Sequence, residues 1–317
     1  MNKLALISKN RMIPGIILLI GLIILIVLPF ISQIYTIILL STIFMYIVLT
    51  SSWAMFSGPT GQISLATAAF FGVGIYIAAT LGNHMPLLLM VLISGLISGC
   101  MALLVGGLTL RLKGVYFTIF TFGLLELIKY LLLWFEVTFT GTRGRFVVVV
   151  DHTTIYFYML AITVLTLLTA FLIRRSKYGL ALQSIGEQEE AAEHIGINVT
   201  LVKVSIFAIS AFFMGAAGAI IATKWTYVDP YIAFNMNYSF TPVLMAIFGG
   251  MGQLAGSVLG AVIFAYLEQI LITKFPYYYM LLFGIVMVVS VVYLPNGLTG
   301  LIQKWRSRAA GGNDAHS

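Results

Sequence analysis

The chain has 317 residues, of which 61% are hydrophobic and only 9% are charged, and its mean hydropathy is +1.06. Soluble globular domains carry about 25% charged residues, so this chain has too few polar side chains to cover a water-facing surface. The composition therefore excludes an ordinary soluble protein. The net charge of +7 does not indicate nucleic-acid binding, because the topology below explains it.

Ten apolar segments are candidates for crossing the membrane, which takes about 20 residues of helix. In chain order they are 13–31, 34–55, 63–81, 86–110, 115–135, 155–173, 203–223, 238–251, 257–273 and 278–295. The segments are apolar at every position rather than at every second one, unlike the strands of a β-barrel. The expected fold class is an all-α polytopic membrane protein with about ten transmembrane helices.

The basic residues indicate the orientation of these helices, because Lys and Arg next to membrane spans concentrate on the cytoplasmic side. With ten spans and a cytoplasmic N-terminus, 12 of the 17 basic residues fall inside: Lys3, Lys9, Arg11, Arg111, Lys113, Arg174, Arg175, Lys177, Lys203, Lys304, Arg306 and Arg308. Four fall outside: Arg143, Arg145, Lys224 and Lys274. Both termini are therefore expected in the cytoplasm.

Residues 1–302 are expected to form one transmembrane domain, followed by a basic and then polar cytoplasmic tail, 303–317. The chain has no H-E-x-x-H pair, no G-x-S-x-G turn and no G-x-x-x-x-G-K-[ST] phosphate loop. We therefore expect neither an enzyme nor a cofactor on this chain. The single cysteine, Cys100, lies in the fourth span and is expected to be a small buried thiol.

The longest hydrophilic stretch is 174–203, which the topology places in the cytoplasm. The segment from Glu187 to Gly196 is rich in Glu and Ala, which are strong helix formers, and glycine suits the left-handed end of a helix. Asn198 is suited to cap the seventh span. The pattern predicts a short helix lying on the cytoplasmic face between two spans.

Glu190, Ala191, Ala192 and Gly196 together resemble the E-A-A-x-x-x-G loop of permeases of bacterial ATP-binding-cassette importers. The resemblance implies that this helix docks in a groove of an ATPase subunit, with a coupling set of Glu187, Glu190, Ala191, Ala192 and Gly196. The alternative is an ordinary amphipathic helix on the surface. An I-x-L-P sequence that often follows the loop in other importers is absent.

Further segments resemble, in the same order, the signatures of branched-chain amino-acid permeases of the LivM type. They are Gly61-Gln62-Ile63-Ser64-Leu65, Ala68 to Tyr76, Leu112 to Tyr116, Phe122 to Lys129, Ser176 to Gly179, Ile195 to Val199, Gly249 to Gly252 and Leu294 to Leu298. The resemblance covers about residues 50–302. Two departures, Ala66-Thr67 and the stretch Thr140 to Gly144, leave the substrate open among branched-chain amino acids, urea, amides and aromatic acids.

The resemblance implies a set of partners in the bacterial cytoplasmic (inner) membrane. They are a LivH-type permease paralogue, two ATPase subunits that carry ATP and Mg²⁺, and an extracytoplasmic substrate-binding protein. Cofactors are expected on the ATPase subunits and none on this chain.

Polar residues inside spans are costly and usually face protein or a water-filled cavity. Glu126 and Lys129 lie three apart on the fifth span, so they form either part of the substrate path or a structural ion pair. Gln62, Ser64 and Thr67 follow a Gly-Pro break and are the other path candidates. Glu268 and Gln269 are expected to reach the outer interface.

Two rival functions belong to other classes of membrane protein. An ion-coupled secondary transporter would need an internal carboxylate relay, for which Glu126 and Glu268 are the candidates. A membrane-embedded enzyme or redox subunit would need metal or haem ligands inside spans, whereas the four histidines fall in loops or the tail.

Overall fold

A computed structural model describes residues 19–82, 84–110, 112, 114–293 and 297–300, which are almost entirely helical. After an initial helix, Leu19–Phe30, the helices are α2 (Ile34–Thr60), α3 (Thr67–Leu81), α4 (Leu87–Thr109), α5 (Val115–Phe135, continued by a π-helical turn Glu136–Thr140), α6 (His152–Arg175), α7 (Lys177–Glu187), α8 (Glu189–His194), α9 (Val199–Ala222), α10 (Pro230–Ala233), α11 (Asn237–Gly249), α12 (Leu254–Lys274) and α13 (Tyr279–Tyr293). The expected all-α architecture is confirmed for these residues.

Among the described residues, six helices are long and apolar enough to cross a membrane: α2, α4, α5 with its π-helical turn, α6, α9 and α12. α3 has 15 residues, α11 has 13 and α13 has 15. At 1.5 Å per residue these helices are about 20–23 Å long, against a hydrocarbon core of about 30 Å. The count of about ten spans therefore stays a prediction. Residues 13–18 and the tail 303–317, and with them the placement of both termini, lie outside the described residues.

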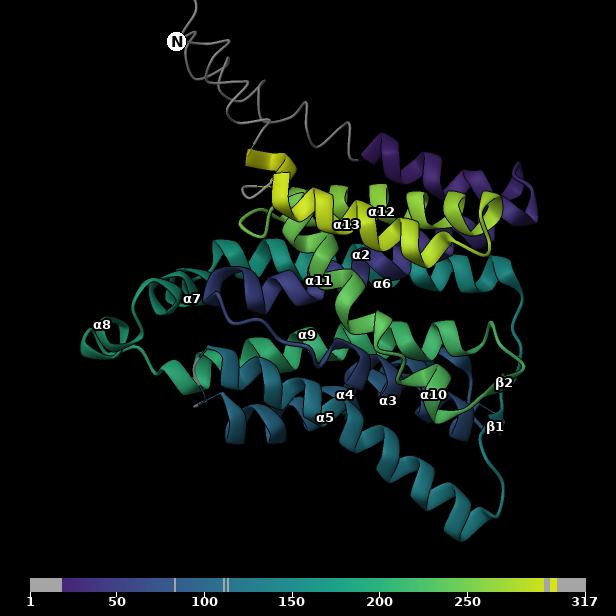
Figure 1. Cartoon of the computed structure of the whole chain (residues 1–317), viewed down its shortest axis with the longest axis horizontal. Helices are drawn as coiled ribbons and strands as arrows, with labels where there is room; N and C mark the ends of the chain where they lie inside the picture. The colour runs from purple at the N-terminus through teal and green to yellow at the C-terminus, as the bar shows by residue number, and fades with distance from the viewer. Residues whose placement is uncertain (1–18, 83, 111, 113, 294–296, 301–317) are drawn as a thin grey trace, which may run out of the picture.

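The long helices run side by side along one axis, with α7 and α8 at one end of the bundle and the strands at the other (Figure 1). β1 (Arg145–Phe146) and β2 (Tyr227–Val228) pair antiparallel, with Arg145 opposite Val228. At the strand end, Asp151 caps α6 by accepting a hydrogen bond from the Thr153 amide, which lowers the pKa of its carboxyl group. At the other end, Arg174 and Arg175 occupy the last turn of α6, where cations favour the helix dipole.

α9 lies at the centre of the bundle, where 72% of its most apolar stretch is buried. Glycines bring its backbone against α3, since a Cβ on Gly74 would overlap the carbonyl group of Gly215, and one on Gly218 would overlap that of Phe71. Small residues allow this close packing between membrane helices. The backbones of α9 and α3 are therefore in direct contact.

α5 is the least covered of the long helices, since only 22% of its most apolar stretch is buried. It slants away from the other helices toward the strand end of the bundle (Figure 1). Its exposed side chains include Tyr116, Leu127 and Trp134. This apolar surface faces lipid or another membrane protein.

One expectation for a single residue is wrong, because Cys100 is exposed on α4 rather than buried. A helix that is apolar on all sides does not indicate which side its neighbours cover. The expectation that Glu268 and Gln269 reach the outer interface stays a prediction, and both residues are partly exposed near the end of α12.

Candidate functional site

The predicted coupling segment forms two helices rather than one. α7 runs from Lys177 to Glu187 and is capped by Ser176, whose hydroxyl oxygen accepts a hydrogen bond from the Tyr178 amide at 3.2 Å. Gln188 then adopts an extended conformation (φ −156°, ψ 108°) and separates α7 from α8. The expectation of a single helix from Glu187 onward is therefore wrong, because Glu187 belongs to α7 while Glu190, Ala191 and Ala192 belong to α8.

α8 ends as its sequence predicts. Gly196 has φ +88°, a left-handed conformation that glycine adopts without strain, and the Ile197 amide donates a hydrogen bond to the Ala192 carbonyl at 3.1 Å. Asn198 caps α9 by accepting a hydrogen bond from the Leu201 amide at 3.0 Å. The connection from α8 to α9 is thus short and hydrogen bonded at both sides.

The two alanines of α8 face different surroundings. Ala192 is buried, at 1% exposure, whereas Ala191 is exposed. Glu187 and Glu190 are also exposed. α8 projects from the end of the bundle (Figure 1). Ala191 and the two glutamates therefore lie where a partner protein can contact them, and Ala192 does not.

Lys203 was expected in the hydrophilic loop, but it lies in the second turn of α9 and is 1% exposed. Its Nζ atom lies 2.9 Å from Oε2 of Glu189, at the start of α8. The sequence signal was its apolar neighbours, Val202 and Val204, which are typical of a span rather than a loop. The hydrophilic loop therefore ends at Asn198, five residues earlier than expected.

The break between α2 and α3 is a non-helical segment, residues 61–66. Side chains from α2 and α5 bind its backbone. Trp53 donates to the Ser64 carbonyl at 2.7 Å, the Thr118 hydroxyl to the Ile63 carbonyl at 2.8 Å, and the Thr121 hydroxyl accepts from the Leu65 amide at 3.0 Å. Non-helical backbone persists at membrane depth only when protein or water satisfies it in this way.

Ser239, the third residue of α11, completes the binding of this segment. Its hydroxyl group donates to the Leu65 carbonyl at 2.7 Å and accepts from the Ala68 amide at 2.9 Å. Ser239 is fully buried. The start of α3 and the start of α11 are therefore joined through one side chain.

The path candidates Gln62, Ser64 and Thr67 are all buried, at 8%, 4% and 1% exposure. Ser64 and Thr67 border a void of about 10 Å³, which has room for about one water molecule. In this conformation the void is too small for a solute of the size of an amino acid. The three residues lie beside the break, as expected, but line no open passage among the described residues.

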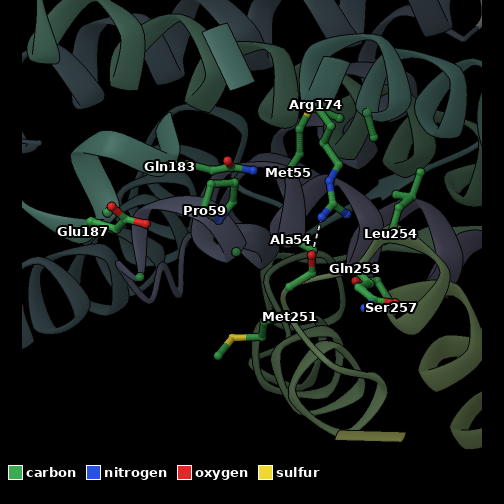
Figure 2. Close-up of a pocket in the computed structure, with 15 residues that line it drawn as sticks. Ala54, Met55, Pro59, Arg174, Gln183, Glu187, Met251, Gln253, Leu254 and Ser257 are labelled. Atoms are coloured by element: carbon green, nitrogen blue, oxygen red, sulfur yellow. Dashed lines mark hydrogen bonds between the residues drawn. The ribbon is translucent and has the colours of Figure 1, made fainter. Parts of the chain in front are cut away.

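A larger cleft of about 390 Å³ opens at the α8 end of the bundle (Figure 2). Gly58, Pro59 and Gly61 at the end of α2 form one side, and Gly186 and Glu187 of α7 form another. Gly186 packs so closely that a Cβ there would overlap the carbonyl group of Pro59. The structure thus packs α7, next to the coupling segment, on the end of α2, next to the helix break, a proximity that no local sequence pattern indicates.

The remaining side of the cleft is the turn between α11 and α12. The guanidinium group of Arg174 reaches across and donates a hydrogen bond to the Gly252 carbonyl, drawn as the dashed line in Figure 2. Gln183 and Gln253 add amide groups to the lining. The cleft therefore has a mixed polar and apolar lining and borders α2, α6, α7 and α12 at the end where α8 projects.

Glu126 and Lys129 pair with each other, with Nζ 2.6 Å from Oε2, and their side chains are 25% and 12% exposed. Lys129 also lies 5.8 Å from the ring centre of Tyr231, in α10, and Arg143 lies 4.9 Å from the same ring. The pair therefore lies on the side of α5 that faces α10, close to the ring of Tyr231 and the guanidinium group of Arg143.

Glu136 is a further buried acid that the sequence analysis missed, at 1% exposure. Its carboxylate accepts hydrogen bonds from the Gly144 amide at 2.8 Å and the Tyr76 hydroxyl at 3.3 Å, and lies 3.4 Å from Nε of Arg145. It ties the loop before β1 to α3. The signal was an acid at the end of an apolar run, shortly before two arginines.

The sequence is similar over most of its length to two characterised permeases. One is the high-affinity branched-chain amino acid transport system permease protein LivM of Salmonella typhimurium, at 28% identity over 85% of this chain and 72% of that protein. The other is LivM of Escherichia coli K12, at 27% identity over 90% of this chain and 76% of that protein. No solved structure matches the chain.

A shorter similarity extends to a sugar permease. The xylose transport system permease protein XylH of Haemophilus influenzae is 31% identical over 38% of this chain and 33% of that protein. The family model described as branched-chain amino acid transport system, permease component, matches residues 35–291. The chain therefore belongs to this family of multi-pass membrane permeases.

Proposed function

We propose that this permease component imports a small polar solute, most favourably a branched-chain amino acid, in a complex driven by ATP hydrolysis on other subunits. The LivM proteins resemble the chain over 85% and 90% of its length, whereas XylH resembles it over 38%. Because the similarity to the LivM proteins covers nearly the whole chain, an amino acid is favoured over a sugar as the substrate. Urea, amides and aromatic acids are the other candidate substrates.

The observation that carries the coupling role is the arrangement of α8. It projects from the end of the bundle, presents Ala191 outward and ends in a capped connection at Gly196. A small exposed residue lets a partner surface approach closely. In our proposal α8 docks on an ATPase subunit through Ala191, with Glu187 and Glu190 beside it, while Ala192 packs inward.

Motion of the docked segment would reach the membrane by way of α7. Gly186 packs on Pro59 at the end of α2, and the break that follows contains Gln62 and Ser64 and leads to Thr67 at the start of α3. In our proposal this break opens and closes the substrate path as α7 moves. Glu126 and Lys129 would face the same path from α5, whose exposed surface suits a LivH-type partner permease.

The complete importer would then hold this chain, a permease paralogue, two ATPase subunits with ATP and Mg²⁺, and an extracytoplasmic binding protein. This chain would supply no cofactor. Its contribution would be a gated path, opened to one side of the membrane at a time.

The test is transport by the complex reconstituted in proteoliposomes with its binding protein, with leucine, xylose and urea as labelled substrates. We expect uptake of leucine only when ATP and Mg²⁺ are present on the ATPase side. Uptake of xylose in place of leucine would refute the proposed substrate class. Robust uptake by this chain alone, driven by an ion gradient, would refute the importer and favour a secondary transporter.

A further inference from the structure

Lys203 carries a positive charge in a buried position. Its side chain is 1% exposed, and its Nζ atom lies 2.9 Å from Oε2 of Glu189 but forms no hydrogen bond of good geometry among the described residues. A buried ammonium group is destabilising unless it is paired, and an apolar side chain of similar size would avoid that penalty. Stability alone therefore does not account for a lysine at this position.

The ion pair joins two elements that are otherwise linked at one end only. Glu189 is the first residue of α8, and Lys203 lies in the second turn of α9. The other end of α8 reaches α9 through the four residues 195–198. A helix of six residues is not stable by itself. Gln188 joins α8 to α7 and Ala192 is buried, while the ion pair and the 195–198 connection hold α8 against α9.

α9 then leads from α8 to the centre of the bundle. Gly218 of α9 packs on α3 without room for a Cβ, and a Cβ on Gly74 of α3 would overlap the carbonyl group of Gly215. α3 in turn begins directly after the break at residues 61–66. A force on α8 is transmitted along α9 to the contact with α3 only if α8 keeps a fixed orientation relative to α9.

We propose that Glu189 and Lys203 are positioning residues that fix α8 on α9, so that both helices move as one body when an ATPase subunit acts on α8. This inference rests on the proposed coupling function of α8 and adds a second route to the one through α7. The attraction between the two charges keeps α8 in one orientation, and the ATPase need not contact either charge.

The first test needs no partner. In the purified chain in lipid nanodiscs, we expect the amides of α8 to exchange hydrogen about tenfold faster in Glu189→Gln than in the wild type. Glu193→Gln is the matched control, since Glu193 is an exposed acid on the same helix. Unchanged exchange in Glu189→Gln, or an equal effect in the control, would overturn the proposal.

The second test uses the assembled complex and measures solute transported per ATP hydrolysed. We expect Glu189→Gln and Lys203→Met to retain the ATPase subunits but to lose at least about fivefold in this ratio. The charge-reversed pair, Glu189→Lys with Lys203→Glu, should recover most of it. Because Lys203→Met removes the buried charge altogether, it should remain folded. A wild-type ratio in Lys203→Met, or no recovery in the assembled reversed pair, would overturn the proposal.

A third variant distinguishes failure of this inference from failure of the coupling function itself. Ala191→Arg changes the outward side of α8 and does not touch the ion pair. If it abolishes ATPase binding while Glu189→Gln has no effect, only the present inference fails. If Ala191→Arg transports normally with its ATPase bound, the coupling function of α8 fails.

Discussion

Replacing Gly196 with valine changes the backbone at the end of α8 without creating a steric clash. Gly196 has φ +88°, a conformation that β-branched residues resist, and a Cβ at this position would meet no atom within 4 Å. The expected cost is therefore backbone strain alone, about 1–3 kcal/mol. That energy lowers the fraction of molecules in which the Ile197 amide is hydrogen bonded to the Ala192 carbonyl by about 5- to 150-fold.

A series of substitutions at Gly196 turns this argument into a measurement. Asparagine enters the left-handed region most readily, alanine less so and valine least, so we expect the damage to increase in that order. The assays are hydrogen exchange at the Ile197 amide, which bonds to the Ala192 carbonyl, together with ATP-dependent transport. Wild-type exchange and transport in the valine variant, or equal damage by asparagine and valine, would refute the reasoning.

Three further predictions concern docking, the break and the topology. Ala191→Arg should insert and express normally but purify without ATPase subunits, as measured by co-purification. Ser239→Ala removes hydrogen bonds to Leu65 and Ala68 and should cost about 1–3 kcal/mol, measured as a lower melting temperature in detergent. A cysteine at position 143 should react with an impermeant thiol reagent added to intact cells, and one at position 193 should react only after the membrane is opened.

Each of these measurements has a control or a decisive contrary result. Ala170→Arg should fail to fold and so lose expression, because Ala170 is 1% exposed in α6 and leaves no room for a long charged side chain. Cys100 must first be replaced, since it is exposed on α4. Labelling of position 193 in intact cells would contradict the topology, and an unchanged melting temperature in Ser239→Ala would show that the break does not depend on that contact.

The sequence by itself determined the class of the protein, its family, and the local features of its helices. Long apolar runs can be buried only in lipid or in a core of helices, so the composition identified a polytopic membrane protein before any contact was known. Gly196 predicted the end of α8 and Asn198 predicted the start of α9, because helix capping depends only on neighbouring residues.

Only the tertiary structure decided which features act together, because contacts between distant segments leave no local pattern. Ser239 binds the backbone at Leu65, 174 positions away, and Gly186 packs on Pro59. The exposure of Cys100 was also undetermined, because a span is apolar on the side that faces lipid and on the side that faces protein alike. The ion pair of Lys203 with Glu189 was also undetermined by the sequence, because a lysine near a span is equally typical of a cytoplasmic loop, whereas in the structure Lys203 is buried.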